Sequence, residues 1–280
     1  MIKEFAVDPE TLARWDDCRY ILALFSAGSG RVIANFPKKW KRDAFVAARN
    51  AATPMERKRI EERLRRLDNT VLLSRKRPAG NNDNWLENAL QEHERLPFTS
   101  IISKESEDNV IAVDDIDEAS VPFLVPRGIS VDRTAEAMAD AVSMMFEAGN
   151  HFKFIDPYFS STQTYMQPMQ AFIERISRRA AGVENIVIEL ICKDEGNTEA
   201  NRRFRHNVSF EINKFLPDQM ELRVSLFPDH LIHDRWILAE WVGIKFGHGF
   251  GTGGDNPSVN LDLLDESTRK RHWDEFTQGD

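Results

Sequence analysis

The alternation of apolar and polar residues is most regular in the second half of the chain, where it predicts a layered α/β domain. Three stretches have the apolar spacing of amphipathic helices, and short apolar runs between turn residues predict strands. The run at 186–192 is apolar almost throughout, which is typical of a strand covered on both faces. The expected helices are 135–146 (capped by Ser130 or Asp132 and ended by Gly149), 163–180 and 198–215, and the expected strands are 152–155, 186–192, 222–227, 236–239 and 242–246.

The first half of the chain has a less regular pattern, which predicts a mixed α/β fold. An apolar run at 20–25, a turn at 26–30 and apolar residues at 31–35 predict a hairpin, because the turn lacks the Gly-Lys-Ser/Thr ending of a phosphate loop. We also expect helices at 54–67 and 85–94, and short strands at 96–102 and 110–113.

A domain boundary is expected near Pro126, where acidic segments and two prolines interrupt the apolar pattern. The predicted organisation is an N-terminal mixed α/β accessory domain at 1–126, followed by a larger α/β domain at 127–280. That second domain is expected to be a layered mixed sheet flanked by helices.

The composition is that of a soluble globular protein, with 41% apolar and 29% charged residues. No run approaches the roughly 20 apolar residues that a membrane span needs, and Met1 is not followed by a basic and then apolar leader. Cys18 and Cys192 form no Cys-x-x-Cys pair, which fits a reducing compartment. We therefore expect a cytoplasmic protein without a transmembrane segment.

The net charge of −8 argues against a protein that coats nucleic acid over its whole surface, but the charge is unevenly distributed. Residues 36–78 contain fourteen Lys or Arg against five Asp or Glu, whereas residues 104–118 contain one Lys against seven acids. This asymmetry permits a local phosphate-binding face. The alternative is that the segment 56–67 is an ordinary solvated helix with paired charges.

One segment, 222–254, combines the residues best suited to catalysis. It contains His233-x-Arg235, then Glu240 five residues beyond the arginine, then a predicted strand and a glycine-rich turn that begins Gly247-His248-Gly249. This pattern resembles the phospholipase D superfamily, in which His-x-Lys, an acid five residues later, a strand and a Gly-Ser-x-Asn-like turn follow one another.

The resemblance covers roughly 150 residues, from about Ile129 onward, and includes the order of the strands and helices before the motif. The His-Asp-Arg sequence and the single motif are most similar to a divergent branch of the superfamily. That branch includes the C-terminal domains of microtubule-interacting-and-transport proteins and domains of bacterial conflict and defence proteins. Some of its members bind membranes instead of cleaving a substrate.

The resemblance implies a role for each motif residue in cleaving a phosphodiester without a metal or other cofactor. His233 would attack phosphorus and form a phosphohistidine, Arg235 would hold the phosphate oxygens, and Glu240 would orient the imidazole. Asp156 and Tyr158 would line the same pocket from the end of a strand. The expected substrate-binding residues are Asp156, Tyr158, Asp234, Gly247, His248 and Gly249, the glycines allowing phosphate to approach backbone amides.

The chain departs from the family pattern in three ways: Arg replaces Lys, Glu replaces Asp, and the turn lacks its Ser and Asn. Because the reaction needs two histidines and the chain has one motif, we expect a homodimer. His151-x-Lys153 also has the His-x-Lys spacing, but no matching acid or turn follows it, so we treat it as a decoy. A metal site is disfavoured because His230 and His233 would not share a strand face and no cysteine joins them.

Two functions remain open at this point. The first is a metal-independent phosphodiesterase, a nuclease with nucleic acid as its substrate, in a setting such as bacterial anti-phage defence. The second is a catalytically inactive module that binds nucleic acid, an anionic lipid surface or a protein partner. In either case the first domain would supply specificity through its basic segment from Lys38 to Arg77, or would contact a partner.

Overall fold

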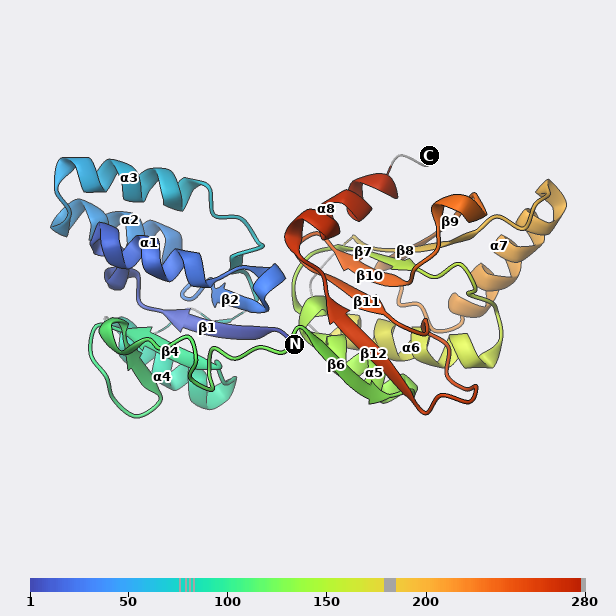
Figure 1. Cartoon of the computed structure of the whole chain (residues 1–280), viewed down its shortest axis with the longest axis horizontal. Coiled ribbons are helices and arrows are strands. Elements are labelled where there is room, and N and C mark those ends of the chain that lie inside the picture. Colours follow the sequence, from blue (N-terminus) through green and yellow to red (C-terminus); the bar gives the residue numbers. More distant parts are fainter. Residues whose placement is uncertain (76, 79, 81, 83, 179–184, 278–280) are drawn as a thin grey trace. The chain divides into compact units, whose positions relative to one another are not determined.

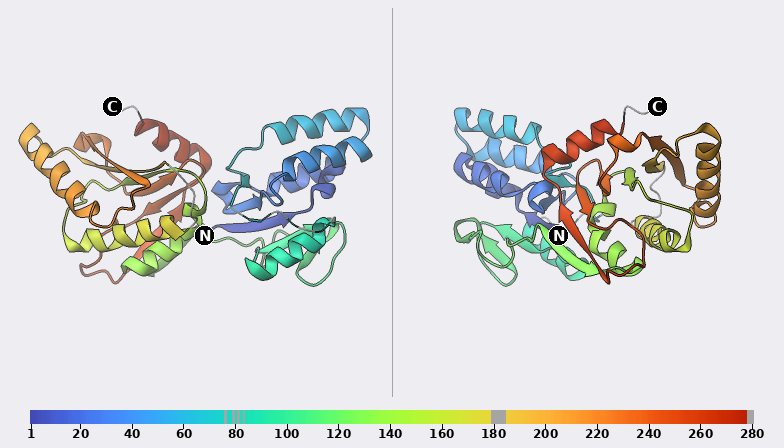
Figure 2. Two further views of the ribbon diagram at one scale, coloured as in Figure 1. Left: turned by 180° about the vertical axis from the view of Figure 1, so that it is seen from behind. Right: turned by 45° about the vertical axis from the view of Figure 1, so that its right-hand side comes forward.

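The computed structural model is an α/β structure that describes residues 1–75, 77–78, 80, 82, 84–178 and 185–277. It divides into two compact units, Ile2–Pro126 and Arg127–Asp280. Each unit contains one sheet with helices on both faces (Figures 1 and 2). Among the described residues, none of the helices is long and apolar enough to cross a membrane.

The N-terminal unit has a five-stranded sheet of order β3-β2-β1-β4-β5, in which every described pairing is parallel. Connections between parallel strands need crossovers, and helices provide them between β1, β2, β3 and β4. The elements are β1 (Lys3–Val7), α1 (Trp15–Leu24), β2 (Arg31–Ala34), α2 (Trp40–Ala51), α3 (Pro54–Arg65), β3 (Leu72–Leu73), α4 (Trp85–Arg95), β4 (Ser100–Ser103) and β5 (Val110–Ala112).

Two separate apolar layers hold this sheet. Helices α1, α2 and α3 pack on one face through residues such as Ile21, Ala44 and Ile60, whereas α4 covers the other face through Ala89 (Figure 1). The helix ends follow local sequence signals, as at α3, where Thr53 and Glu56 form a capping box. The face covered by α4 also adjoins buried charged residues, among them Glu92 of α4 itself.

The predicted hairpin at 20–35 is wrong. Residues 20–24 continue α1, because Cys18, Ile21 and Leu22 form a helical stripe that is buried against the sheet. Strand β2 then pairs with β1 in the parallel direction, so the turn at 26–30 does not join two antiparallel strands. Short apolar runs fit either a strand or a buried helix, and tertiary packing decides between them.

The C-terminal unit has a seven-stranded mixed sheet of order β6-β12-β11-β10-β7-β8-β9. Strands β7, β8 and β9 are mutually parallel, and the remaining pairings are antiparallel. The elements are β6 (Gly128–Asp132), α5 (Ala135–Val142), β7 (His151–Ile155), α6 (Gln163–Arg178), β8 (Ile186–Lys193), α7 (Thr198–Ile212), β9 (Met220–Phe227), β10 (Trp236–Ala239), β11 (Gly243–Phe246), β12 (Ser258–Leu263) and α8 (Glu266–Glu275).

Aromatic side chains fill the space between this sheet and α6. Phe172 of α6 contacts the rings of Phe146, Phe154, Phe246 and Phe250, with ring centroids 5.6–6.1 Å apart. On the opposite face α8 packs through Trp273 and the adjoining Phe276 (Figure 2). The sheet is thus covered on both faces near its centre, as the apolar run of β8 predicts.

One boundary prediction in this unit is wrong and another lies outside the described residues. Ser130 and Asp132 do not cap a helix, since both belong to β6, which pairs with β12. The cap of α5 is Thr134, whose hydroxyl accepts a hydrogen bond from the amide of Ala137. The predicted end of α6 at Ala180 falls among residues that the structure does not describe.

Candidate functional site

Three neighbouring strands bring charged residues to one edge of the C-terminal sheet, which is the end at which the parallel strands β7 and β8 finish. Strands β7 and β8 are parallel, so Asp156, which follows β7, and Lys193, the last residue of β8, lie at the same edge. Strand β10 runs antiparallel to β7 with Trp236 opposite Ile155, which places Arg235 at that edge as well. The sheet topology therefore gathers an acid and two cations that are far apart in sequence.

Asp156 is a buried carboxyl group at the centre of this edge, with 1% of its surface exposed. Its Oδ1 accepts a hydrogen bond from the amide of Tyr158 (2.9 Å), and its Oδ2 accepts one from the amide of Phe250 (3.1 Å). Burial raises the pKa of Asp156, while the two amides and the charges of Arg235 and Arg133 act in the opposite direction. Asp156 thus joins the end of β7 to the glycine-rich loop.

The glycine-rich loop at 247–254 closes over Asp156 because residue 249 has no side chain. Gly249 has a φ of +77°, and a Cβ there would lie 2.5 Å from Oδ2 of Asp156. Arg133 holds the loop from outside: its Nε donates to the carbonyl of Gly251 (2.7 Å) and its Nη2 to that of His248 (3.1 Å). The amide of Gly247 donates to the carbonyl of Asn260 on β12.

Tyr158 is the exposed aromatic residue of the edge, with 54% of its surface accessible. The guanidinium carbon of Arg235 lies 4.8 Å from the centroid of its ring, and Nζ of Lys193 lies 5.2 Å from it. Both are within cation–π range. The Nε of Arg235 is buried and has no hydrogen-bond partner in the part of the chain that the structure describes. An anion at this position would supply the missing acceptor.

His233 lies two residues before Arg235 in an exposed segment. Its Nε2 is 3.0 Å from the carbonyl oxygen of His230, and a carbonyl oxygen only accepts hydrogen bonds. The Nε2 therefore carries the proton, and in the neutral ring Nδ1 keeps the lone pair that a nucleophile needs. The neighbouring Asp234 forms an ion pair with Lys245 of β11 at 3.0 Å.

The structure does not bring Glu240 close to His233 and Arg235. Glu240 follows the carboxyl end of β10, and its Oε2 lies 3.3 Å from the position of a Cβ at Gly149. The four residues of β10 separate it from Arg235, so the two ends are roughly 16 Å apart along the strand. The carboxyl group that lies near Arg235 is Asp156, which like Arg235 lies against Gly249.

A cavity of about 500 Å³ opens beside Tyr158, between the ends of β7 and β8 and helix α7. Its lining includes Lys193, Arg203, Phe204 and Asn207, none of which belongs to the motif. Lys193 has one sequence signal, since it directly follows the apolar run of β8. The α7 residues have none, because their position depends on how the helix packs.

His151 and Lys153 lie elsewhere, on the face of the sheet that α8 covers. Nζ of Lys153 donates to Oγ1 of Thr277 (2.6 Å) and to the carbonyl of Trp273 (3.2 Å), while Nε2 of His151 lies 3.0 Å from the Glu189 carboxylate. The contacts of Lys153 attach the C-terminal end of α8 to the sheet, whereas the contact of His151 joins β7 to β8.

His248 lies 3.1 Å from the side-chain amide of Asn256, with its Nε2 facing the Asn256 nitrogen. It remains in the glycine-rich loop near the candidate site. Among the residues that the structure describes, no three His, Cys, Asp or Glu side chains form a group that would hold a metal ion.

Comparisons with known proteins give little further information. No protein family and no curated protein matches the chain. A solved structure that matches is that of TrmBL2, an archaeal chromatin protein described as showing a novel mode of DNA binding. It is 12% identical, over 55% of this chain and 52% of its own length, with a TM-score of 0.30. The chain thus spans about half of that protein, and a likeness of this size supports no conclusion about the fold or function of this chain.

Proposed function

We propose that the C-terminal unit is a metal-independent phosphodiesterase of the phospholipase D type that cleaves nucleic acid. The observation that supports this most strongly is the position of Arg235. Its guanidinium has a buried Nε without a partner in the described chain, lies against Tyr158, and stands two residues from the exposed imidazole of His233. A phosphate group would satisfy the arginine and present its phosphorus to the histidine.

The chemistry has two displacements. The unprotonated nitrogen of His233 attacks phosphorus, a P–N bond forms, and the bond between phosphorus and the leaving oxygen breaks. That oxygen takes a proton from a second imidazolium. Water then attacks phosphorus and gives its proton to the second imidazole, and the P–N bond breaks to release His233.

The second imidazole would come from His233 of another copy of the chain. A symmetric homodimer places identical residues on both sides of its axis, so two copies of the same edge would supply both histidines. The Arg235 and Tyr158 of each copy would then hold one side of the substrate. Within a single chain, His151 contacts Glu189 beneath α8, and the ring of His248 in the glycine-rich loop contacts Asn256.

The decisive experiment measures cleavage of DNA, RNA and a small chromogenic phosphodiester in EDTA. We expect wild-type activity that persists in EDTA, is lost in His233→Ala and is retained in His230→Ala. The matched variant also removes an exposed imidazole, but it keeps the backbone carbonyl that holds the His233 ring. Equal activity of wild type and His233→Ala would contradict the proposal.

Two observations favour a second candidate, an inactive module that binds phosphate-containing ligands. Glu240 lies at the opposite end of β10 from Arg235, and the loop lacks the Ser and Asn of the family pattern. In that case the wild type would bind oligonucleotides, anionic vesicles or a protein partner without cleaving anything. Binding that weakens steeply with salt would identify nucleic acid, whereas a need for anionic head groups would identify lipid.

The cellular setting is also part of this proposal. Two cysteines without a Cys-x-x-Cys pair fit a reducing compartment, so we propose a cytoplasmic protein, in a role such as anti-phage defence. The N-terminal unit would add specificity or bind a partner. Survival of phage-infected cells expressing wild type or His233→Ala would test the defence role directly.

A further inference from the structure

The N-terminal unit contains a cavity of about 650 Å³ next to the carboxyl ends of two parallel strands. Asn35 directly follows β2 and Ser74 directly follows β3, and both line the cavity together with Pro78. Ligands of parallel α/β sheets bind outside the carboxyl ends of the strands. The volume is within the range of small-molecule sites, roughly 300–1,000 Å³.

Four cations line this cavity: Lys38, Arg75, Arg77 and Arg95. Two carboxylates, Glu4 and Glu92, pair with the three arginines. Among the lining residues that the structure describes, the charged ones are all cations. Lys38, Arg75 and Arg77 come from the two ends of the basic segment at 36–78, which the sequence identified as a possible phosphate-binding face.

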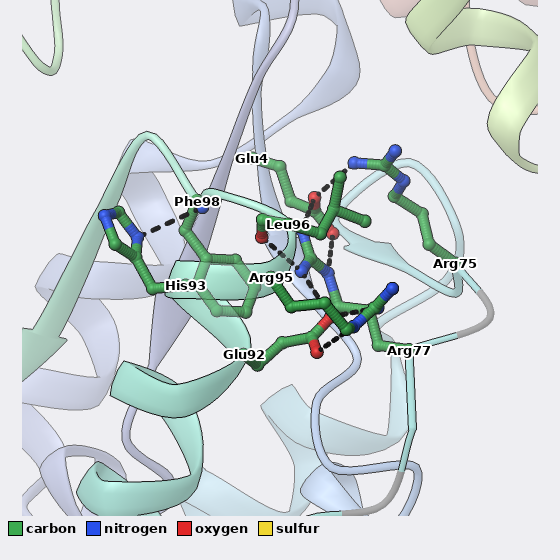
Figure 3. Close-up of polar contacts among 8 residues, drawn as sticks. All are labelled: Glu4, Arg75, Arg77, Glu92, His93, Arg95, Leu96 and Phe98. Carbon is green, nitrogen blue, oxygen red and sulfur yellow. Dashed lines mark hydrogen bonds and ion pairs between the residues drawn. The ribbon is translucent and has the colours of Figure 1, made fainter.

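Arg77 is the fixed centre of the charged group (Figure 3). Its side chain is 2% exposed, and its Nη1 donates to the Glu92 carboxylate and to the Leu96 carbonyl, each at 2.8 Å. Its Nε donates to Glu4 at 3.2 Å, and its guanidinium carbon lies 3.9 Å from the ring centroid of Phe98. These bonds occupy Arg77, so its role is to hold the two carboxylates in place.

The two carboxylates in turn position the outer arginines (Figure 3). Glu4 accepts a hydrogen bond from Nη1 of Arg75 at 2.8 Å. Glu92 accepts bonds from both Nε and Nη2 of Arg95 at 2.8 and 2.6 Å, which leaves the Nη1 edge of a half-exposed guanidinium for a ligand. Cations held in this way lose little side-chain entropy when they bind an anion.

Polar groups on the other side of the cavity fit an uncharged part of the ligand. The side-chain amide of Asn35 donates to the hydroxyl of Ser74 at 2.9 Å. The carbonyl oxygen of Asn35 is buried without a hydrogen-bond partner in the described part of the chain. A hydroxyl or amine that met this oxygen after a rotation of the amide would remove the cost of leaving it unpaired.

We infer that this cavity binds a phosphorylated small molecule of nucleotide size, independently of the proposed phosphodiesterase site. The phosphate would lie against Lys38, Arg75 and Arg95, with the sugar or base beside Asn35 and Ser74. A second cavity of about 320 Å³ shares Pro78 and Arg95 with the first and provides space for a longer ligand. A volume of about 650 Å³ suits a mononucleotide, whereas the phosphates of a polymer need an extended basic surface.

The test is isothermal titration of the full chain with ATP, AMP and inorganic phosphate. We expect saturable binding of a nucleotide, at least tenfold weaker in Lys38→Glu and in Arg95→Ala. Lys39→Glu is the matched control, because Lys39 is exposed and adjacent but does not line the cavity. Circular dichroism and a thermal melt would check that each variant is folded.

Asn35→Ala tests whether the sugar or base of the ligand is recognised separately from its phosphate. We expect it to weaken nucleotide binding severalfold while leaving inorganic phosphate binding unchanged. The inference is overturned if no probe binds at millimolar concentration, if Lys39→Glu weakens binding as much as Lys38→Glu, or if an oligonucleotide binds and no mononucleotide does. Nucleotide binding that is lost in His233→Ala and kept in Lys38→Glu would place the ligand in the C-terminal unit and would also overturn it.

Discussion

Gly249 lies so close to Asp156 that any side chain at position 249 would meet the carboxylate: a Cβ would be 2.5 Å from Oδ2. The amide of the next residue, Phe250, donates to the same oxygen at 3.1 Å. The loop and the end of β7 are therefore fixed to each other through one buried acid. Arg235 adjoins both, with its Cγ 3.6 Å from the same hypothetical Cβ.

Gly249→Ala is expected to destabilise the C-terminal unit by about 2–4 kcal/mol. The left-handed backbone contributes about 1–2 kcal/mol, and displacement of the buried carboxylate contributes the rest. Gly253→Ala is the matched control, because Gly253 also has a positive φ but its nearest neighbour, Thr164 Cγ2, would be 3.7 Å away. Urea unfolding of both variants measures the difference. Equal losses of stability would show that the contact with Asp156 is unimportant.

The pH dependence of stability is expected to differ between wild type and Asp156→Asn. Burial raises the pKa of Asp156, so the folded chain keeps this proton to a higher pH than the unfolded chain. Wild-type stability should therefore fall, relative to the variant, as the pH rises from about 4 through the raised pKa. The asparagine keeps one acceptor oxygen for the two amides, as a protonated Asp156 does, and it carries no charge at any pH.

Urea unfolding of the two proteins over a series of pH values gives this comparison. Asp255→Asn, which removes an exposed carboxyl group beyond the same loop, serves as the control. If the stability of wild type and Asp156→Asn changed in parallel with pH, the carboxyl group of Asp156 would not be responsible.

The sequence led us to expect Asp156 and Arg235 in one pocket, and strand direction does bring these distant residues to the same edge. Asp156 follows β7, Arg235 precedes β10, and the two strands pair in the antiparallel direction. The same geometry explains why Glu240 is elsewhere, since a four-residue strand carries it to the opposite edge. Spacing along the chain alone did not show which end of the strand would matter.

Other features depend on packing that leaves no local signal. Arg133 reaches the glycine-rich loop only because β6, a strand that the sequence did not reveal, pairs with β12. In the N-terminal unit β3 has only two residues, too short for an alternating pattern. The parallel arrangement of that sheet was therefore missed, although helices α3 and α4 were predicted from their caps and apolar stripes.

Tyr158→Ala is expected to weaken the binding of a phosphodiester substrate about two- to fivefold, the amount that an exposed cation–π contact contributes. The ring lies 4.8 Å from the guanidinium of Arg235, so its loss also frees the arginine to move. Tyr158→Phe keeps the ring and should bind nearly as well as wild type. Titration with a fluorescent oligonucleotide measures both. If Tyr158→Phe were as weak as Tyr158→Ala, the hydroxyl and not the ring would be the important group.

Arg77→Met is expected to cost the N-terminal unit about 3–5 kcal/mol, because it leaves the carboxylates of Glu4 and Glu92 buried without their central cation. The methionine fills part of the space, so most of the loss comes from charge. Arg95→Ala removes an arginine that is half exposed and should cost less than about 1 kcal/mol. Urea unfolding gives the free energies.

Adding Glu4→Gln and Glu92→Gln to Arg77→Met tests the electrostatic explanation. Without the two negative charges the triple variant should recover much of the lost stability, since a buried group of neutral residues costs less than an unpaired charge. Hydrogen exchange at the amides of β1, the strand that carries Glu4, would locate the change in the N-terminal sheet. A triple variant less stable than Arg77→Met would contradict the electrostatic explanation, because the bonds of Glu4 to Arg75 and of Glu92 to Arg95 would then outweigh the relief of the unpaired charges.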